Sequence, residues 1–134
     1  MQKALSSYGL HYSEMHTKKV FFIVEIGINH NGDMELLEEM ASEGRYTFIS
    51  TGMSTWEEVD AAVAVFRRHG CPFELLHCNS TYPMAVEDAN LLLIPEIRNR
   101  YNVPTGFSSH ETGDVATIGA VLVTTDPGGT NAIT

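Results

Sequence analysis

Short apolar runs that end in polar loops recur along this 134-residue chain, and each loop leads into a segment of helical character. The first run, Val20 to Ile26, is rich in β-branched and aromatic residues, which is typical of a strand buried on both faces. Further strands are predicted at residues 46–50, 73–77 and 103–107. Strands that alternate with helices pair in parallel, so the sequence predicts an α/β fold whose functional residues lie in the loops after the strands.

The segments between these strands carry the start and stop signals of helices. Residues 34–41 predict a short helix that stops near Gly44. In the next helix, Ser54 and Glu57 have the S-x-x-E spacing of a capping box, and Gly70 supplies the stop. Three apolar residues of this helix are expected on one face: Val59, Val63 and Phe66.

The third helical segment, residues 87–100, contains a proline. Pro95 predicts either a break in this helix or a second short helix that begins near it, because proline lacks the N–H that a helix interior needs. Residues 115–123 are small and apolar and could form a last helix. After a turn signal at residues 126–129, residues 130–134 could begin a fifth strand.

The charge and the cysteines restrict the partners and the compartment. A formal net charge of -9 argues against nucleic acid and anionic membranes as partners and favours a small molecule. The apolar run at residues 20–24 is far shorter than the roughly 18 residues of a membrane span. Cys71 and Cys78 form no C-x-x-C pair and no secretory leader is recognised, so we expect reduced thiols and a cytoplasmic location.

Four sequence strings at the expected strand-to-loop junctions appear in the order in which one enzyme family has them. They are EIGINHNGD at 25–33, ISTGM at 49–53, LLHCNSTYP at 75–83 and GFSSHETG at 106–113. Through these strings the chain, from about Val20 to about Val121, resembles the phosphoenolpyruvate-dependent sialic acid synthases (N-acetylneuraminate synthases). The resemblance implies a fold of the TIM-type (β/α)₈ barrel class.

The resemblance also implies a reaction. Synthases of this family condense phosphoenolpyruvate with an N-acetylated aldose such as N-acetylmannosamine, which yields a nonulosonic acid and releases phosphate. A divalent cation, manganese or magnesium, acts as a Lewis acid on the sugar aldehyde. Six residues take roles by this resemblance: His110 as metal ligand and catalytic residue, Glu25 as a catalytic residue near the metal and its water, Ser50 and Ser108 on the phosphate, and Tyr82 and Ser80 on the sugar.

Each of these residues also has a plainer structural explanation. A histidine in a polar loop is often only a hydrogen-bonding loop residue, so His110 takes its role from the family context. His77 points from a buried strand, which favours a core or supporting histidine, and Ser50 could be a strand-end cap. A purely structural role explains Glu25 less well, because a carboxylate beside an apolar strand is costly unless it is paired, metal-bound or solvated. Ser80 stands where we expect asparagine in the family.

The chain is shorter than the family pattern. Met40-Ala41 passes almost directly into the strand before ISTGM, so strands two to four of the barrel are expected to be absent, together with the lysines that neutralise phosphoenolpyruvate. No lysine follows Lys19, and no histidine follows His110 to act as the family's second metal ligand. The C-terminal antifreeze-like domain is also expected to be absent. We therefore expect an N-terminal arm at residues 1–19 and one partial barrel domain at residues 20–134.

Four or five strands cannot close a barrel, so we expect an incomplete TIM-type barrel, an open parallel sheet flanked by helices. In family order the surviving strands are five, six, seven, one and, if residues 130–134 form a strand, eight. These strands are adjacent around the closed barrel and could form one contiguous parallel sheet, with strand one beyond the last strand. The exposed edges of such a sheet could pair with another copy to form a homo-oligomer. Two functions stay open: the synthase reaction, weakened by the missing lysines, and a non-catalytic fragment that binds metal or phosphate or pairs with a full-length synthase.

Overall fold

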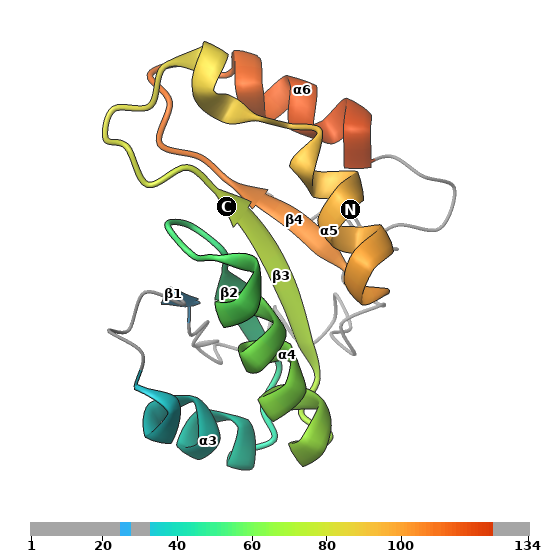
Figure 1. Ribbon diagram of the computed structural model, residues 1–134. Coiled ribbons are helices and arrows are strands. Elements are labelled where there is room, and N and C mark those ends of the chain that lie inside the picture. Colours follow the sequence, from blue (N-terminus) through green and yellow to red (C-terminus); the bar gives the residue numbers. More distant parts are fainter. Residues whose placement is uncertain (1–24, 28–32, 125–134) are drawn as a thin grey trace, which may run out of the picture.

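A parallel sheet of four strands, in the order β1-β2-β3-β4, is present in the computed structural model, which describes residues 25–27 and 33–124 (Figure 1). The strands are β1 (Glu25–Gly27), β2 (Thr47–Ser50), β3 (Phe73–Cys78) and β4 (Thr105–Ser108). The helices are α3 (Met34–Ser42), α4 (Trp56–His69), α5 (Leu93–Tyr101), α6 (Val115–Thr124) and the 3₁₀-helix η1 (Val86–Ala89). Each strand is joined to the next through a helix, as parallel pairing requires. The predicted α/β class and parallel sheet are confirmed.

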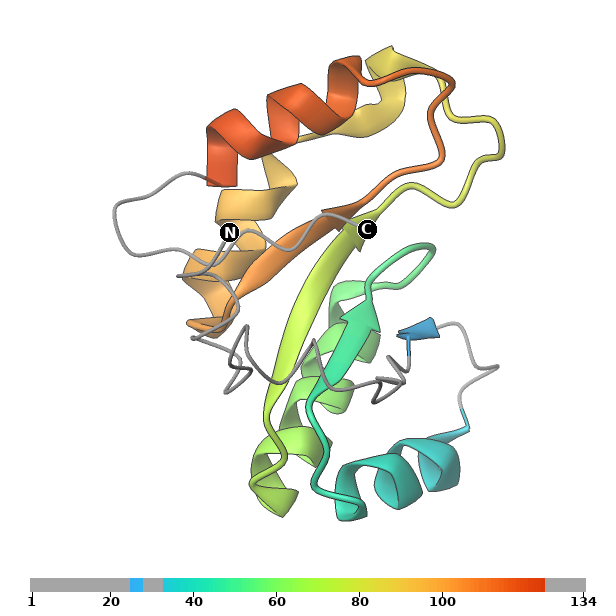
Figure 2. The ribbon, with the colours of Figure 1, turned by 180° about the vertical axis from the view of Figure 1, so that it is seen from behind.

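The hydrophobic core lies between the helices and one face of the sheet. The strand registers place Ile49 beside Leu75, and His77 beside Phe107, so these alternate residues share a face. Ile49 and Leu75 belong to a buried cluster with residues of α3, α4 and α5, and Phe107 belongs to a second cluster with residues of α5 and α6. Seen from behind, β2 and β3 lie in front of α4 (Figure 2). The sheet thus has one helix-covered face and one opposite face, as a section of a (β/α) barrel has.

The helices end and break close to the predicted positions. Gly44 follows α3 with φ +64°, and Gly70 ends α4 with φ +62°, both in the left-handed region that glycine adopts readily. Pro95 lies in the first turn of α5, and η1 forms a separate helix before it, so the alternative with a second short helix is confirmed. The three apolar residues expected on one face of α4 are all buried: Val59, Val63 and Phe66.

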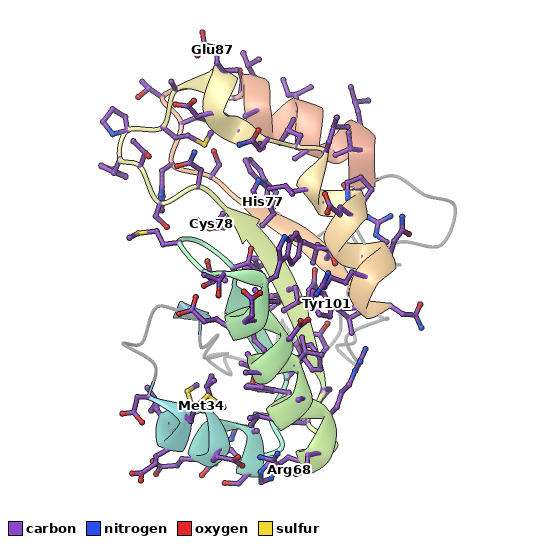
Figure 3. All side chains as sticks on the ribbon, in the orientation of Figure 1. Met34, Arg68, His77, Cys78, Glu87 and Tyr101 are labelled. Atoms are coloured by element: carbon purple, nitrogen blue, oxygen red, sulfur yellow. The ribbon has the colours of Figure 1, made fainter. Side chains whose placement is uncertain are left out.

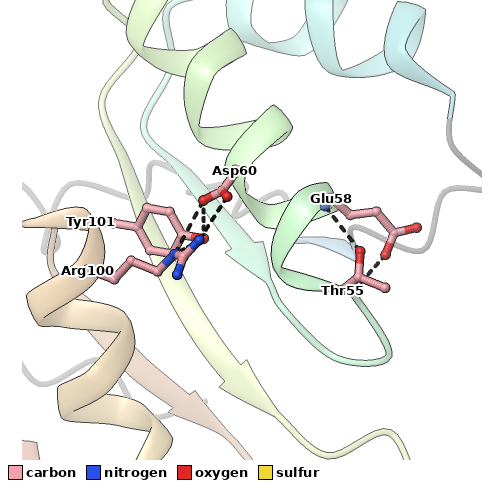
Figure 4. Close-up of polar contacts among 5 residues, drawn as sticks. All are labelled: Thr55, Glu58, Asp60, Arg100 and Tyr101. Carbon is pink, nitrogen blue, oxygen red and sulfur yellow. Dashed lines mark hydrogen bonds and ion pairs between the residues drawn. The ribbon is translucent and has the colours of Figure 1, made fainter.

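The capping box of α4 lies one residue later than predicted. Thr55 accepts a hydrogen bond from the Glu58 N–H at 3.3 Å, and the Glu58 carboxylate accepts one from the Thr55 N–H at 2.7 Å (Figure 4). Ser54 instead donates to the Gly52 carbonyl at 3.3 Å, within the preceding turn. The assignment to Ser54 and Glu57 is wrong because the string STWEE contains the same spacing twice, and spacing alone cannot choose between them.

The position of β1 differs from the expected strand order. β1 pairs with β2, with Glu25 opposite Phe48 and Gly27 opposite Ser50. Strand one therefore does not lie beyond the last strand, and that expectation is wrong. The physical reason is the short connection: α3 is the helix between the two strands, and a single βαβ crossover places consecutive parallel strands side by side.

Several expectations fall on segments outside the described residues. These are the N-terminal arm at residues 1–19, the start of the first strand at residues 20–24, and the fifth strand at residues 130–134. They stay predictions. Within the described segments, none of the helices combines the length and the apolar character that crossing a membrane would require.

A polar contact ties α4 to α5 (Figure 4). The Asp60 carboxylate accepts hydrogen bonds from Tyr101 Oη at 2.7 Å and from Arg100 Nη2 at 2.9 Å. The hydrogen bonds from Arg100 and then Tyr101 lower the pKa of Asp60. The Arg100 guanidinium also lies 4.9 Å from the centre of the Trp56 ring, a cation–π distance. These contacts fix the relative position of the two helices that flank β3.

Candidate functional site

Two of the predicted serines stand at the carboxyl ends of β2 and β4, on the face opposite the helices. Ser50 alternates with the helix-facing Ile49, and Ser108 alternates with the helix-facing Phe107. Both serines are buried, each with 7% of its surface exposed. Cys78, at the end of the intervening strand β3, stands opposite Ser108 in the register. The structure therefore brings both predicted phosphate-binding residues to one face, with β3 between them.

His110 lies in the loop after β4 and is held by the loop after β3. Its Nδ1 lies 3.1 Å from the carbonyl oxygen of Asn79. Because a carbonyl oxygen can only accept, Nδ1 carries the proton and donates, and Nε2 of the neutral ring keeps its lone pair. The N–H of Met84 donates to the His110 carbonyl at 2.9 Å and anchors the backbone of the same residue. The imidazole is thus oriented so that Nε2 can accept a proton or bind a metal ion.

The two predicted sugar-binding residues, Tyr82 and Ser80, lie in the same loop but in different surroundings. The ring of Tyr82 meets that of His110 edge-on, with centroids 5.4 Å apart, and the tyrosine is 84% exposed. Ser80 lies against the loop after β2, where a Cβ placed on Gly52 would come within 2.5 Å of Ser80 Oγ. The structure therefore places Tyr82 with His110, and Ser80 with Gly52.

Glu111, which directly follows His110, was not singled out from the sequence. Its carboxylate accepts hydrogen bonds from the Ala116 N–H at 2.8 Å and from the Thr117 N–H at 2.7 Å. Burial acts to raise the pKa of Glu111, but the hydrogen bonds from Ala116 and Thr117 outweigh it, so the pKa is lowered. The carboxylate thus caps the first turn of α6 and fixes the loop that carries His110. A glutamate shortly before an apolar helix is the signal from which this role could have been predicted.

A cavity of about 580 Å³ opens at the carboxyl end of β3 and is lined by residues of α4, of α5 and of the segment around η1, together with His77 and Cys78, which are labelled on β3 in Figure 3. His77 forms part of its wall, and its Nε2 donates to the Ala89 carbonyl at 2.8 Å. Burial lowers the pKa of His77, which favours the neutral ring. The prediction that His77 is a buried, hydrogen-bonded histidine is confirmed. Of the predicted site residues whose side chains the structure describes, Ser80 alone lines this cavity.

The described residues do not by themselves fit a divalent cation. Among them, no three His, Cys, Asp or Glu side chains come together in a way that could hold a metal ion. Glu25 stands opposite Phe48 in the register of β1 and β2, but its side chain lies outside the described part of the structure. His110 would therefore be one ligand where a manganese or magnesium site needs several.

The basic residues of the described segments lie away from Ser50 and Ser108. Arg68 pairs with Glu38 of α3, and Arg98 donates to the Thr124 carbonyl at 3.4 Å. The five arginines stand before β2 or in the last turns of α4 and α5: Arg45, Arg67, Arg68, Arg98 and Arg100. In a βαβ unit the end of a helix lies near the amino end of the next strand. Within the described part, the carboxyl ends of the strands therefore have no arginine to neutralise a phosphate.

A parallel sheet with helices on one face and polar loops gathered at the carboxyl ends of its strands is the architecture of a section of a TIM-type (β/α) barrel enzyme. Comparison with known proteins identifies the family. Residues 11–125 match the model of the NeuB family, and the chain belongs to the NeuB family.

Named relatives and solved structures agree with this assignment. The chain is 32% identical to N-acetylneuraminate-9-phosphate synthase of Mus musculus over 81% of its own length and 30% of the relative's. It is 37% identical to pseudaminic acid synthase of Campylobacter jejuni over 68% of its own length and 27% of the relative's. The structure of the N-acetylneuraminic acid synthetase of Leptospira borgpetersenii matches with a TM-score of 0.73 and 33% identity, covering 83% of this chain and 38% of that one. The chain thus spans less than a third of the length of each of these two curated relatives.

Proposed function

We propose that this chain carries part of a nonulosonic acid synthase site, whose reaction condenses phosphoenolpyruvate with an N-acetylated aldose such as N-acetylmannosamine. The methylene carbon of phosphoenolpyruvate forms a bond to the aldehyde carbon of the open-chain sugar. Water then adds to the former enol carbon, and inorganic phosphate leaves. The observation that supports this proposal most directly is the orientation of His110, whose Nδ1 donates to Asn79 so that Nε2 remains available beside Tyr82.

The other predicted residues take complementary parts in the proposed reaction. The hydroxyl groups of Ser50 and Ser108 would donate hydrogen bonds to the phosphate, and both residues stand on one face of the sheet at the strand ends. Tyr82 would hold the sugar next to His110, with Ser80 on the same loop. Glu25 would orient the water that adds to the enol carbon. A manganese or magnesium ion is part of the proposal, with His110 as one ligand, but no step is assigned to it because the described residues do not complete its site.

A second candidate function is favoured by the position of the arginines. A phosphate removed from water needs charge-assisted donors, and the described strand ends offer hydroxyl and amide groups instead. The chain would then be a non-catalytic piece that binds phosphate or metal weakly, or that pairs with a full-length synthase. Among the described strands, β1 and β4 each pair on one side, so pairing between copies at these edges is part of this second candidate.

The test compares phosphate release from phosphoenolpyruvate plus N-acetylmannosamine, with manganese, in the wild type, His110→Ala and Ser108→Ala. The catalytic proposal expects both variants to fall well below the wild type, and Glu87→Gln on the exposed side of η1 to match it. Equal background rates in all four proteins would rule out the catalytic proposal. Size-exclusion chromatography with and without a full-length relative then tests the second candidate, because a fragment that pairs must elute earlier in the mixture.

The cellular setting belongs to the same proposal. Both described cysteines are free, and the Cys71 thiol donates to the Arg45 carbonyl at 3.1 Å. A cytoplasmic location stays a prediction from the sequence. The same holds for the expectation that neither nucleic acid nor membrane is a partner, which rests on the net charge of -9.

A further inference from the structure

The loop after β3 contacts His110 through Asn79, Tyr82 and Met84. The Asn79 carbonyl oxygen lies 3.1 Å from His110 Nδ1, the Tyr82 ring meets the imidazole edge-on, and the Met84 N–H donates to the His110 carbonyl. The contact with Asn79 differs from the other two because it acts on a ring nitrogen. A carbonyl oxygen can only accept, so it selects the neutral imidazole that carries its proton on Nδ1.

The side chain of Asn79 fixes the direction of the carbonyl group of the same residue. Asn79 Oδ1 accepts a hydrogen bond at 2.9 Å from the N–H of Thr81, two residues further on, which forms an Asx turn. The ring that this hydrogen bond closes runs through the peptide carbon of Asn79, and that carbon carries the oxygen that faces His110. Rotation of this peptide group would break the bond to Thr81, so the turn and the direction of the carbonyl are coupled.

The turn is also tied to its neighbours on both sides. Asn79 Nδ2 donates to the Asp88 carbonyl in η1 at 2.9 Å, so both ends of the side-chain amide are bonded within the protein. The sheet sets the distance to His110, because Cys78 at the end of β3 stands opposite Ser108 at the end of β4. The Asn79 carbonyl therefore has a fixed position and a fixed direction relative to the loop that carries His110.

We infer that Asn79 is a positioning residue for His110, because its Asx turn holds the carbonyl that keeps the imidazole proton on Nδ1 and leaves Nε2 as an acceptor. Without the turn, the carbonyl rotates away from the ring. The proton of the neutral imidazole can then move to Nε2, which donates instead of accepting. Asn79 acts only through His110 and contacts no reacting atom. The consequence for phosphate release rests on the proposed function, whereas the tautomer is a property of the folded chain alone.

The experiment reads the tautomer of His110 by nuclear magnetic resonance. Two-bond ¹H–¹⁵N correlation spectra of the chain labelled with ¹⁵N-histidine distinguish a protonated ring nitrogen from an unprotonated one. They are recorded without substrate at alkaline pH, where imidazole is neutral, and His110→Ala identifies the His110 signals. The wild type is expected to carry the proton on Nδ1. Asn79→Ala is expected to shift the ratio of the two tautomers about fivefold toward Nε2, the effect that loss of one hydrogen bond produces.

Two further variants of Asn79 separate the turn from the mere presence of an amide. Asn79→Asp keeps an oxygen that can accept from the Thr81 N–H, so it is expected to keep the proton on Nδ1. Asn79→Gln moves the amide one bond farther from the backbone and opens the turn, so it is expected to behave like Asn79→Ala and replaces that variant if it does not fold. Two controls are expected to match the wild type. Thr81→Ala retains the N–H of the turn, and Asn99→Ala repeats the substitution on an exposed residue of α5.

Three results would overturn the inference. The first is a wild type with the His110 proton on Nε2, and the second is a wild-type tautomer in both Asn79→Ala and Asn79→Gln. The third is an equal shift in Asn79→Asp, Thr81→Ala or Asn99→Ala, which would show that the turn is not the cause. Phosphate release from phosphoenolpyruvate plus N-acetylmannosamine is measured separately. A wild type that releases no phosphate but carries the proton on Nδ1 would reject the proposed function and leave this inference intact.

Discussion

Glu111 accepts two hydrogen bonds from Thr117, one from its N–H at 2.7 Å and one from its hydroxyl at 2.9 Å. This contact joins the residue next to His110 to the first turn of α6. The other side of the same loop is held by the hydrogen bond between His110 Nδ1 and the Asn79 carbonyl. The position of the candidate metal ligand therefore depends on a carboxylate that the family resemblance did not point to.

Replacing Glu111 by alanine should weaken the start of α6 and loosen the loop that carries His110. Two N–H groups and one hydroxyl lose their acceptor, so we expect a lower urea midpoint and a changed His110 ring environment in the proton spectrum. Asp114→Asn removes one negative charge from the same loop and is the matched control. A midpoint for Glu111→Ala no lower than that for Asp114→Asn would show that the cap does not stabilise α6.

Thr55→Ala should cost about 1 kcal/mol of unfolding free energy, the usual loss for a helix N-cap. Ser54→Ala should cost less, because the Ser54 hydroxyl donates to the Gly52 carbonyl in the preceding turn instead of accepting from an N–H of α4. Urea denaturation of the two variants gives the comparison directly. If Ser54→Ala lost more unfolding free energy than Thr55→Ala, Ser54 would be the N-cap of α4, as the spacing in the sequence predicted.

Gly52→Ala should destabilise the chain by about 1 kcal/mol, since the new Cβ would lie 2.5 Å from Ser80 Oγ and the exposed serine side chain must rotate away from it. Adding Ser80→Ala removes this oxygen and should restore part of the loss. The double-mutant cycle measures this coupling. Additive effects of the two substitutions would mean that the loops after β2 and β3 do not meet at this point.

Acid should weaken the contact between α4 and α5. Because hydrogen bonds from Arg100 and Tyr101 lower the pKa of Asp60 below its ordinary 3.8, the stabilisation is present above that value and is lost as the pH falls through the folded pKa. The wild type should therefore lose more stability on acidification to about pH 3 than Asp60→Asn does. If the urea midpoints of the wild type and Asp60→Asn fell equally with decreasing pH, the pKa of Asp60 would not be lowered in the folded chain. The Asp60–Arg100 pair is exposed to solvent, so the effect should be small.

Tyr101→Phe tests the buried part of the same contact. Its hydroxyl donates to Asp60 at 2.7 Å and the residue is 4% exposed, so losing that hydrogen bond should cost about 1 kcal/mol in urea unfolding at neutral pH. An unchanged unfolding free energy would show that the hydroxyl contributes nothing to the α4–α5 contact.

Much of the local structure was predictable because its causes are local. The apolar runs that become β2, β3 and β4 are strands with buried side chains on the helix-covered face, and Gly70 ends α4 where a left-handed backbone is needed. Pro95 predicted a boundary because its ring is tolerated in a first turn and not in a helix interior. The candidate site could be placed at the strand ends for the same reason, since parallel strands all end at one edge.

The arrangement of these elements was decided by contacts that no local pattern records. The sequence determined an α/β chain of the NeuB family, with parallel strands and polar loops at their ends. Only the tertiary structure decided that β1 pairs with β2, that Glu111 caps α6 beside His110, and that His77 lines a cavity on the helix-covered side. Strand spacing and residue type settle which segments become strands and helices. The partners of those segments also depend on which side chains meet across the sheet, and those contacts exist only once the chain has folded.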